Sequence, residues 1–497
     1  MTRPRMPRLA ALLLAGLAAA CGRHQSAQLC QLPEPQASAL PTLPVAAGAG
    51  QSQAIHFGVR TAGQTVAFDV PAGTASVTIV EQGASAAVPL TVRSGTSVAD
   101  NTPVPLSVDV TGVGNIFFDV PMPPDAALRK VPPGTGLTVL DPVSDPNLAV
   151  YFLSSAAWAG ALTLPNTTTP IPGTPPGAGV PAGTWTVTVS DWAWECRNYP
   201  ALGCTAAALA PSAYDVTVIL KPAAAPSAAL KVVFYLVTNG GLTAANARSN
   251  ADVQRLEWAV GRILSGAGIT PAFQYRDVPV AVRLRYATGV DADGAGVCGL
   301  GQLLQHAEAG NQLNVFLVDR IRGGATGEIT TVGIDPIVPG LASFGGTPAS
   351  GVVVSIEDLG RMRVGSPGCV RNQLALADCG DDRTADVVVH EAGHFMGLYH
   401  TTEAIGTIVD PIADTATCLC PLCKPAGAAG TCQGIGSTDP HVASPYQVLV
   451  SDCLAPSGSV PECGGGDNLM FWLLEAGSEG TVSAGQAAVM RASPLVE

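Results

Sequence analysis

Short runs of alternating apolar and polar residues dominate the chain over residues 51–222. Examples are TVAFDV at 65–70, WTVTV at 185–189 and YDVTVI at 214–219. Alternation with a period of two, broken by Gly, Pro and Asn, is typical of short antiparallel strands. We therefore expect an all-β sandwich over residues 51–222. The stretch 165–181, which is rich in Thr, Pro and Gly, is expected to be a loop within it.

The pattern changes after residues 222–226 (PAAAP), which we interpret as a linker. The run KVVFYLVT at 231–238 is continuously apolar, as in a strand that is buried on both faces. A helix is expected from about 245 to 264, because apolar residues recur there at helical spacing, at Val253, Leu256, Val260 and Ile263. Further strands are expected at 273–276, 314–320 and 351–357. This order predicts an α/β domain with a mixed sheet over residues 228–497.

The first residues combine a basic start with an apolar stretch from Leu9 to Ala20. The stretch is too short to span a membrane and has the layout of a secretory signal, so we expect residues 1–20 to be a signal peptide. The small residues before Cys21 resemble a bacterial lipoprotein lipobox, in which the cysteine becomes the lipidated N-terminus. The alternative is an ordinary cleaved signal followed by a chance cysteine. Both versions predict export, either to the bacterial cell envelope or to the extracellular medium, with residues 21–50 as a flexible tether.

Composition narrows the class of protein. The 497 residues include 25 Lys or Arg and 38 Asp or Glu, for a formal net charge of −13. This balance argues against a nucleic-acid partner, which would need a basic face. Hydrophobic residues make up 47% of the chain and charged residues 13%, so disorder over most of the length is not expected.

Thirteen cysteines are present, and setting Cys21 aside leaves an even number, as a disulfide framework requires. Export makes disulfides the default expectation. Short spacings suggest three pairs: Cys196 with Cys204, Cys369 with Cys379, and Cys453 with Cys463. A structural zinc site is the alternative for a cluster formed by Cys418, Cys420, Cys423 and Cys432.

The segment 384–403, TADVVVHEAGHFMGLYHTTE, carries the candidate chemistry. We expect a helix over 385–396 with Thr384 as its N-cap. On a helix, His390 and His394 project from the same face and can bind one Zn²⁺. Gly397 can adopt the turned backbone that ends the helix and so deliver His400 as a third ligand.

Three protein ligands with an open fourth position form a catalytic zinc site rather than a closed structural one. Glu391 follows the first ligand without being a ligand itself. We therefore expect it to act on water at the metal, as the catalytic base.

His390, Glu391, His394, Gly397 and His400 match the metzincin zinc-peptidase signature in full. The resemblance implies a methionine turn beneath the metal, and the sequence DNLMFW at 467–472 is similar to that turn, with Met470 as its methionine. Within the clan, three features resemble the pappalysin-like branch: the loop 331–340, the segment 410–415 followed by cysteines, and the capping box Ser483–Gln486. The strand 351–357 would then form the upper rim of the cleft, where a peptide substrate adds as a further strand.

Two departures from the family pattern matter. Trp472 stands where some branches place a tyrosine as an additional metal ligand, so a tyrosine switch is not supported. No pro-segment resembles the matrixin cysteine switch. Asp410 and Asp414 could contribute to a Ca²⁺ site, as in some pappalysin-like enzymes, or could be merely solvated.

The stretch 183–191 resembles a strand of the jelly-roll P-domain that accompanies secreted proteases, although any sandwich strand would fit equally well. The sequence therefore predicts a β-sandwich, jelly-roll-like, followed by a metzincin-like zinc endopeptidase with a protein or peptide substrate. A membrane partner is expected only through the lipid anchor. The main alternative is a surface-binding or adhesive lipoprotein with a structural or vestigial zinc site, and a metal-dependent amidase or deacylase is a smaller rival.

Overall fold

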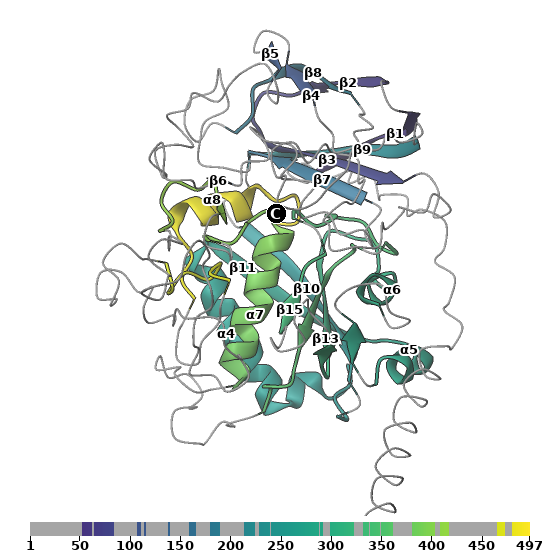
Figure 1. Ribbon diagram of the computed structural model, residues 1–497, viewed down its shortest axis with the longest axis vertical. Coiled ribbons are helices and arrows are strands. Elements are labelled where there is room, and N and C mark those ends of the chain that lie inside the picture. The colour runs from purple at the N-terminus through teal and green to yellow at the C-terminus, as the bar shows by residue number, and fades with distance from the viewer. Residues whose placement is uncertain are drawn as a thin grey trace, which may run out of the picture.

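The N-terminal strands form two four-stranded antiparallel sheets in the computed structural model (Figure 1). Their strands are β1 Gln53–Thr61, β2 Thr65–Val70, β3 Thr74–Gly83, β4 Ser107–Val110, β5 Gly114–Asn115, β7 Ala159–Leu164, β8 Gly183–Thr188 and β9 Ala213–Pro222. One sheet has the order β1-β9-β3-β7 and the other the order β2-β8-β4-β5. The expectation of a β-rich N-terminal region is thus confirmed.

The structure describes part of the chain: residues 52–61, 64–83, 107–110, 114–115, 138–139, 159–165, 179–188, 213–223, 228–238, 240–287, 289–291, 299–322, 332–336, 338–347, 349–360, 380–402, 408–416, 465–472 and 480–497. The expected signal segment, the tether and all thirteen cysteines, including Cys21, lie outside these residues. The predicted lipidation, disulfides and cysteine zinc cluster therefore stay predictions.

The two N-terminal sheets share one buried cluster. Alternate residues of β2, including Val66 and Phe68, are buried in it, and Trp185 of β8 is fully buried. The other sheet contributes Ile79 and Val218 to the same cluster. The period-two alternation in the sequence therefore marks the inward-facing side chains of two packed sheets.

The C-terminal region contains a five-stranded mixed sheet. Its strands are β10 Ala228–Val237, β11 Ile269–Asp277, β13 Leu313–Val318, β15 Gly333–Ile334 and β16 Val352–Ser355. They follow the order β11-β10-β13-β16-β15, in which β15 is antiparallel and the other four are parallel. The expectation of an α/β region with a mixed sheet is confirmed.

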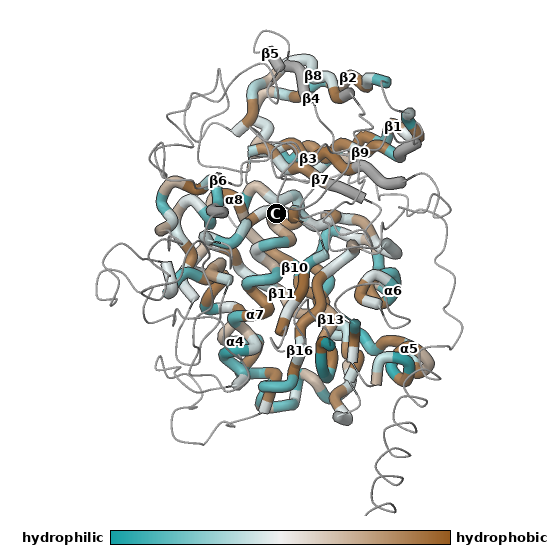
Figure 2. The backbone as a smooth tube through the Cα atoms, in the orientation of Figure 1, coloured by the Kyte–Doolittle hydropathy of each residue, from teal (hydrophilic) through white to brown (hydrophobic). Residues whose placement is uncertain are grey.

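Helices cover both faces of this sheet. The remaining elements are β6 Thr138–Val139, η2 Ala247–Ser249, α4 Ala251–Gly266, α5 Val280–Arg285, β12 Val290–Asp291, α6 Leu300–Leu304, β14 Ile321–Arg322, α7 Gly380–Phe395, β17 Ile408–Val409 and α8 Ala484–Ala492. Along β10, Val232 and Phe234 face the cluster that includes α4 and α7, whereas Val233 and Tyr235 face α5 and α6. The central strands β10 and β13 are accordingly hydrophobic along most of their length, as the brown tubes of Figure 2 show.

Two helix boundaries differ from the sequence expectation. Helix α4 begins at Ala251, where the side chain of Asn250 accepts hydrogen bonds from the backbone N–H groups of Asp252 and Val253. Helix α7 begins at Gly380, so the assignment of Thr384 as its N-cap was wrong. The Thr384 hydroxyl donates instead to the Gly380 carbonyl, 2.8 Å away, which satisfies the side chain inside the helix.

The expected role of residues 351–357 as the rim of the cleft was also wrong. Strand β16 pairs with β13 on one side and with β15 on the other, so neither edge can accept a further strand. The strand at the end of the sheet is β15, which lies within the segment 331–340 that was expected to be a loop. A two-residue strand between loops carries too little periodicity to be recognised in a sequence.

The C-terminal segment after α8 joins the two regions. On the sandwich side, Ser76 Oγ donates to the carbonyl of Ala492 at 2.5 Å, and the Lys221 ammonium donates to the carbonyl of Ser493 at 2.9 Å. On the other side, Glu497 and Ala229 exchange two backbone hydrogen bonds. Strand β6 also pairs in parallel with β17, which follows the histidine motif. The N-terminal strands are therefore in direct contact with the α/β region.

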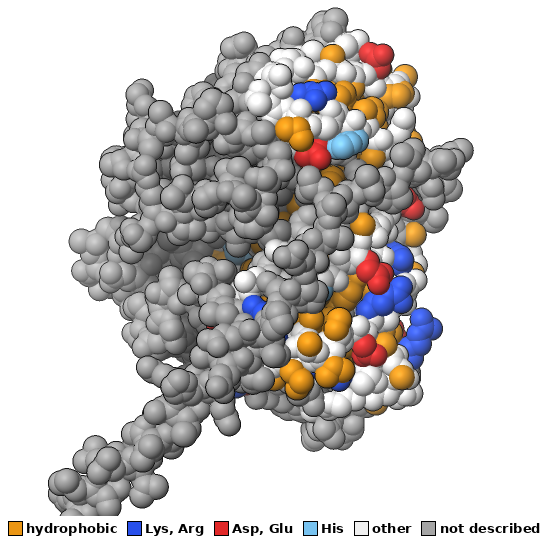
Figure 3. Space-filling model, turned by 90° about the vertical axis from the view of Figure 1, so that its right-hand side faces the viewer, with side chains coloured by type: hydrophobic (Ala, Val, Ile, Leu, Met, Phe, Trp, Pro, Cys, Tyr) orange, Lys and Arg blue, Asp and Glu red, His pale blue; other side chains and the backbone are white. Residues whose placement is uncertain are grey.

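Charges of both signs lie close together on the surface of the described residues. Arg320 pairs with Glu357 at 3.0 Å, and Arg276 lies 3.6 Å from Glu308. Figure 3 shows acidic and basic side chains next to one another on one face. Among the helices of the described part, none has the length and hydropathy needed to cross a membrane.

Candidate metal centre

Helix α7 presents His390 and His394 one turn apart, and the chain then reverses. The helix ends at Phe395, and Gly397 has a φ of +102°, in the region that favours glycine. The N–H of Gly397 donates to the His394 carbonyl at 2.8 Å, and the N–H of Leu398 donates to the Gly393 carbonyl at 2.9 Å. These two bonds close a Schellman-type turn, which redirects the chain toward His400.

The turn brings the three histidines together. The Nε2 atoms of His390, His394 and His400 lie 3.1 Å from one another in all three pairs. Within the described residues, this triad is the group of His, Cys, Asp or Glu side chains that could hold a metal ion. The sequence prediction of a metal-binding triad is confirmed to that extent.

The protonation states implied by the hydrogen bonds fit a cation. Nδ1 of His390 is 2.7 Å from the Leu469 carbonyl, and Nδ1 of His394 is 2.7 Å from the Leu398 carbonyl. A carbonyl only accepts, so each Nδ1 carries the proton and each Nε2 presents a lone pair. Lone pairs that converge at 3.1 Å repel one another, and a cation between them removes that repulsion.

Burial keeps these rings neutral. Desolvation and, to a smaller extent, the neighbouring His400 lower the pKa of His390 to about 3, and the bond to Leu469 opposes both effects. Desolvation, followed by His400 and His390, also lowers the pKa of His394 well below its ordinary value. Neutral imidazole is the form that binds a metal, so the site is ready for an ion at physiological pH.

The dimensions suit a first-row transition metal. The centre of a triangle with 3.1 Å sides is about 1.8 Å from each nitrogen, slightly less than the Zn–N distance of roughly 2.0–2.1 Å. Three imidazoles also suit Cu, Fe and Ni, so the ligands define a class of metals and not one element.

Glu391 lies beside the triad and is 6% exposed. Desolvation raises the pKa of its carboxyl to about 8, whereas His400 and a hydrogen bond from the backbone N–H of Asp335 act in the opposite direction. The backbone of Gly333 in β15 is so close that a β-carbon there would be 2.4 Å from Glu391 Oε1. The sheet-edge segment 333–335 therefore confines the carboxylate next to the histidines.

Met470 packs against the backbone of α7 between the two histidines. The side chain is fully buried, and a β-carbon on Gly393 would be 2.6 Å from its sulfur. The carbonyl of Met470 accepts a hydrogen bond from the N–H of Thr401, the residue after His400. The turn around Met470 thus contacts both chain segments that carry the histidines.

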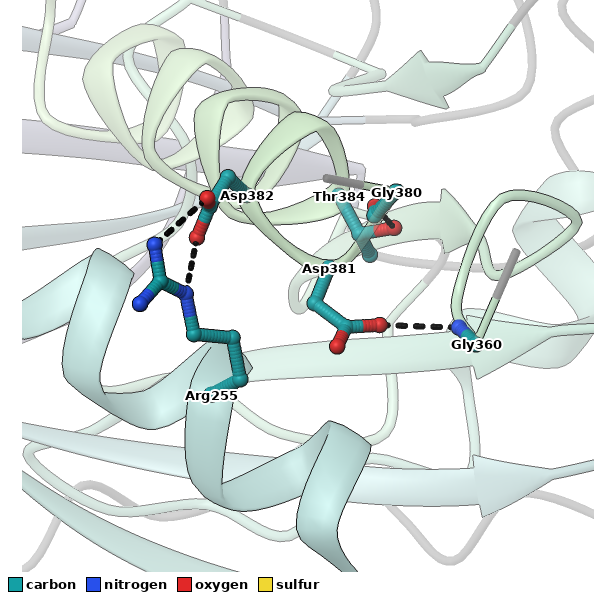
Figure 4. Close-up of polar contacts among 6 residues, drawn as sticks. All are labelled: Arg255, Gly360, Gly380, Asp381, Asp382 and Thr384. Atoms are coloured by element: carbon teal, nitrogen blue, oxygen red, sulfur yellow. Dashed lines mark hydrogen bonds and ion pairs between the residues drawn. The ribbon is translucent and has the colours of Figure 1, made fainter. Parts of the chain in front are cut away.

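The N-terminal half of α7 is held by buried charges (Figure 4). Arg255 of α4 makes a two-pronged ion pair with Asp382, with N–O distances of 2.6 and 2.7 Å. Asp381 accepts a hydrogen bond from the backbone N–H of Gly360 at 2.8 Å. These contacts fix the helix against α4 and against the chain that leaves β16, and so set the position of its histidines.

Asp410 and Asp414, the two residues expected to contribute to a calcium site, accept hydrogen bonds from other groups of the protein. The two carboxylate oxygens of Asp414 accept hydrogen bonds from Ser483 Oγ and from the N–H of Gly485, at the start of α8. Asp410 accepts from the Thr415 hydroxyl at 2.7 Å. A calcium site at these positions stays a prediction.

Several contacts of the site were not foreseen from the sequence. They are the segment Gly333–Asp335 and the carbonyls of Leu398 and Leu469. Backbone groups carry no signal in residue identity, although the glycine at 333 is consistent with a close approach.

Comparison with known proteins adds no identification. No protein-family model matches the chain, and no curated protein matches it.

Proposed function

We propose that the protein is a zinc endopeptidase of the metzincin type, similar to the pappalysin-like branch. The observation that carries the proposal is the convergence of three histidine Nε2 atoms next to a buried carboxyl group that is not one of the three ligands. A purely structural metal site has no use for such a carboxyl group.

His390, His394 and His400 would hold the metal, with their rings oriented by carbonyls in the two cases described above. When bound, a zinc ion supplies Lewis acidity that polarises the scissile carbonyl and acidifies water. Glu391 accepts a proton from the attacking water and transfers it to the leaving amine. The upward shift of its pKa to about 8, caused by burial, suits a group that both accepts and donates a proton near neutral pH.

Strand β15 is the best candidate to align the substrate. It ends the sheet, and within the described strands nothing pairs with its outer edge. Its backbone touches Glu391, so a peptide added there as a further strand would pass the catalytic carboxyl group. The substrate cleft would therefore run along β15 and not along β16.

The proposal extends to the rest of the chain. The N-terminal sheets would form an accessory module, similar to a jelly-roll P-domain, on an exported protein anchored through a lipid on Cys21. Support comes from the signal-like N-terminus and from the two-sheet packing. Mass spectrometry of the N-terminal peptide tests the anchor: a diacylglycerol mass on Cys21 supports it, and an unmodified or absent cysteine refutes it.

The test of activity uses the purified protein on a denatured protein substrate, with and without a chelator, beside Glu391→Gln. The proposal is supported if the untreated wild type cleaves the substrate and both the chelator-treated protein and Glu391→Gln do not. Adding Zn²⁺ after the chelator should then restore cleavage by the wild type. Equal turnover in all samples refutes it. A peptide library and simple acyl amides run in parallel separate a peptidase from an amidase or deacylase, and metal binding without any hydrolysis favours the adhesive lipoprotein.

A further inference from the structure

A fully buried side-chain amide, that of Gln486, pairs with the half-buried amide of Asn468 next to the turn around Met470. Asn468 Nδ2 donates to Gln486 Oε1 at 2.9 Å, and Gln486 Nε2 donates to Asn468 Oδ1, also at 2.9 Å. Gln486 is completely buried, in the first turn of α8. Two amides that face each other in this way satisfy each other without solvent.

Backbone donors fix the orientation of both amides. The N–H of Met470 donates to Asn468 Oδ1 at 2.9 Å, and the N–H of Ser483 donates to Gln486 Oε1 at 3.0 Å. If either amide were rotated by 180°, an NH₂ group would face a backbone N–H. The arrangement therefore has a single low-energy state.

The pair is connected directly to a metal ligand. The residue between Asn468 and Met470 is Leu469, whose carbonyl orients His390 through its Nδ1. The N–H of Met470 and the carbonyl of Leu469 belong to one peptide unit, so the bond from this N–H to Asn468 Oδ1 fixes the direction of that carbonyl. Gln486 holds Asn468, and Gln486 is itself held as the N3 residue of the capping box of α8.

A further contact ties the helix start to the chain that follows the histidine motif. The carboxylate of Asp414 binds Ser483 Oγ and the N–H of Gly485, so α8 begins at a fixed position relative to residues 410–415. An acidic side chain at the N-terminus of a helix is electrostatically favourable. The first turn of α8, which carries Gln486, is therefore held both by its own capping box and by Asp414.

We propose that Gln486 and Asn468 are positioning residues for the metal centre, acting through the Leu469 carbonyl on His390. The inference rests on the metal centre of the proposed function and not on peptide hydrolysis. It predicts that the C-terminal helix, although it supplies no ligand, determines metal affinity.

The experiment compares the full-length wild type with Gln486→Glu, in which a carboxylate oxygen replaces the amide donor and faces Asn468 Oδ1. Zn²⁺ affinity is measured by competition with a chromophoric chelator, and the Nδ1–H signals of the histidines are recorded by NMR on ¹⁵N-histidine-labelled protein. We expect about tenfold weaker Zn²⁺ binding, the size typical of a lost outer-shell contact. The His390 Nδ1–H signal should move, whereas that of His394, which is bonded to Leu398, should stay.

Met490→Ala is the control for the loss of buried volume in α8, because Met490 is also fully buried there and takes no part in the hydrogen bonds of the amide pair. If Gln486→Glu does not fold, Gln486→Asn takes its place. Its side chain carries the same amide but is one methylene shorter, so the amide no longer reaches Asn468. Unchanged affinity in a folded Gln486 variant overturns the inference, as does an equal loss in Met490→Ala. A wild type that binds no metal overturns the proposed function instead, so the two failures are distinguishable.

Discussion

Gly333 at the edge of the sheet and Glu391 of helix α7 are in van der Waals contact. A β-carbon at position 333 would lie 2.4 Å from Oε1 of Glu391 and 2.7 Å from its Cγ. Real β-carbons do not approach other atoms so closely, so any other residue at 333 must displace the carboxyl side chain or the strand. The carboxyl group of Glu391 can therefore occupy its buried position only because residue 333 of β15 is a glycine, which has no side chain.

Gly333→Ala should reduce peptide hydrolysis by about 100-fold, because a displacement of about 1 Å at the reacting group has effects of that size. Zn²⁺ content should not change, since the three atoms nearest to such a β-carbon belong to Glu391 and Val387 and not to a histidine. Gly266→Ala, where a β-carbon meets nothing within 4 Å, is the control. Wild-type kcat in Gly333→Ala would contradict the role given to β15.

Gly393→Ala should destabilise the protein although it lies inside a helix. Alanine normally stabilises a helix interior by about 0.5–1 kcal/mol relative to glycine. Here the new methyl group would meet the buried Met470 sulfur at 2.6 Å, and overpacking of this kind costs about 1–3 kcal/mol. The free energy of unfolding in urea measures the outcome.

Gly261→Ala provides the comparison for Gly393→Ala, because its β-carbon would make an ordinary 3.8 Å contact with Pro271. That variant should be neutral or slightly more stable. Equal effects of the two substitutions would show that Met470 does not press against α7.

Asp382→Asn should destabilise the protein by about 3–5 kcal/mol, since it leaves the Arg255 charge buried without its carboxylate. Replacing both residues, as in Arg255→Met with Asp382→Leu, should recover most of the loss, because two apolar side chains need no compensating charge. Thermal unfolding of the single and double variants measures the coupling. Additive effects would contradict the structural role of the pair.

Lys221 should make the joint between the two regions sensitive to alkaline pH. Burial, with Arg491 adding to the effect and Glu497 opposing it, lowers the pKa of Lys221 from 10.5 to about 8. Between these values the unfolded chain binds more protons than the folded one, so stability gains from this residue as pH rises from about 8 to 10.5. The shift corresponds to at most about 3 kcal/mol.

The measurement for Lys221 is the difference in urea unfolding between the wild type and Lys221→Met at pH 7 and pH 10.5. The wild type should gain stability relative to the variant at the higher pH. A difference that does not depend on pH would mean that Lys221 is not buried against the carbonyls of Arg491 and Ser493.

Periodicity predicted the long elements of this fold well, because their burial is regular. The alternation at 65–70 and the continuous apolar run at 231–238 correspond to β2 and β10. The spacing of the histidines and the glycine at 397 also sufficed to predict that three imidazoles would meet. These features depend on local geometry, which the order of residues specifies.

The sequence could not predict what depends on distant pairing. Strand β15 has two residues, and only its antiparallel pairing with β16 identifies it as the edge of the sheet. Thr384 has the residue type of an N-cap, but α7 begins earlier, at Gly380. The contact of Asp382 with Arg255 of another helix, in this first turn, is not visible in the local sequence. The capping box at Ser483 was recognisable, but the second partner of Gln486 lies in a turn 18 residues away.

Diffraction from crystals grown with Zn²⁺, with anomalous differences collected on both sides of the zinc edge, tests the central claim most directly. The account predicts one zinc peak about 2.0–2.1 Å from Nε2 of His390, His394 and His400, with the carboxylate of Glu391 outside bonding distance. A zinc peak bonded to Glu391, or histidine rings that point away from a common centre, would contradict it.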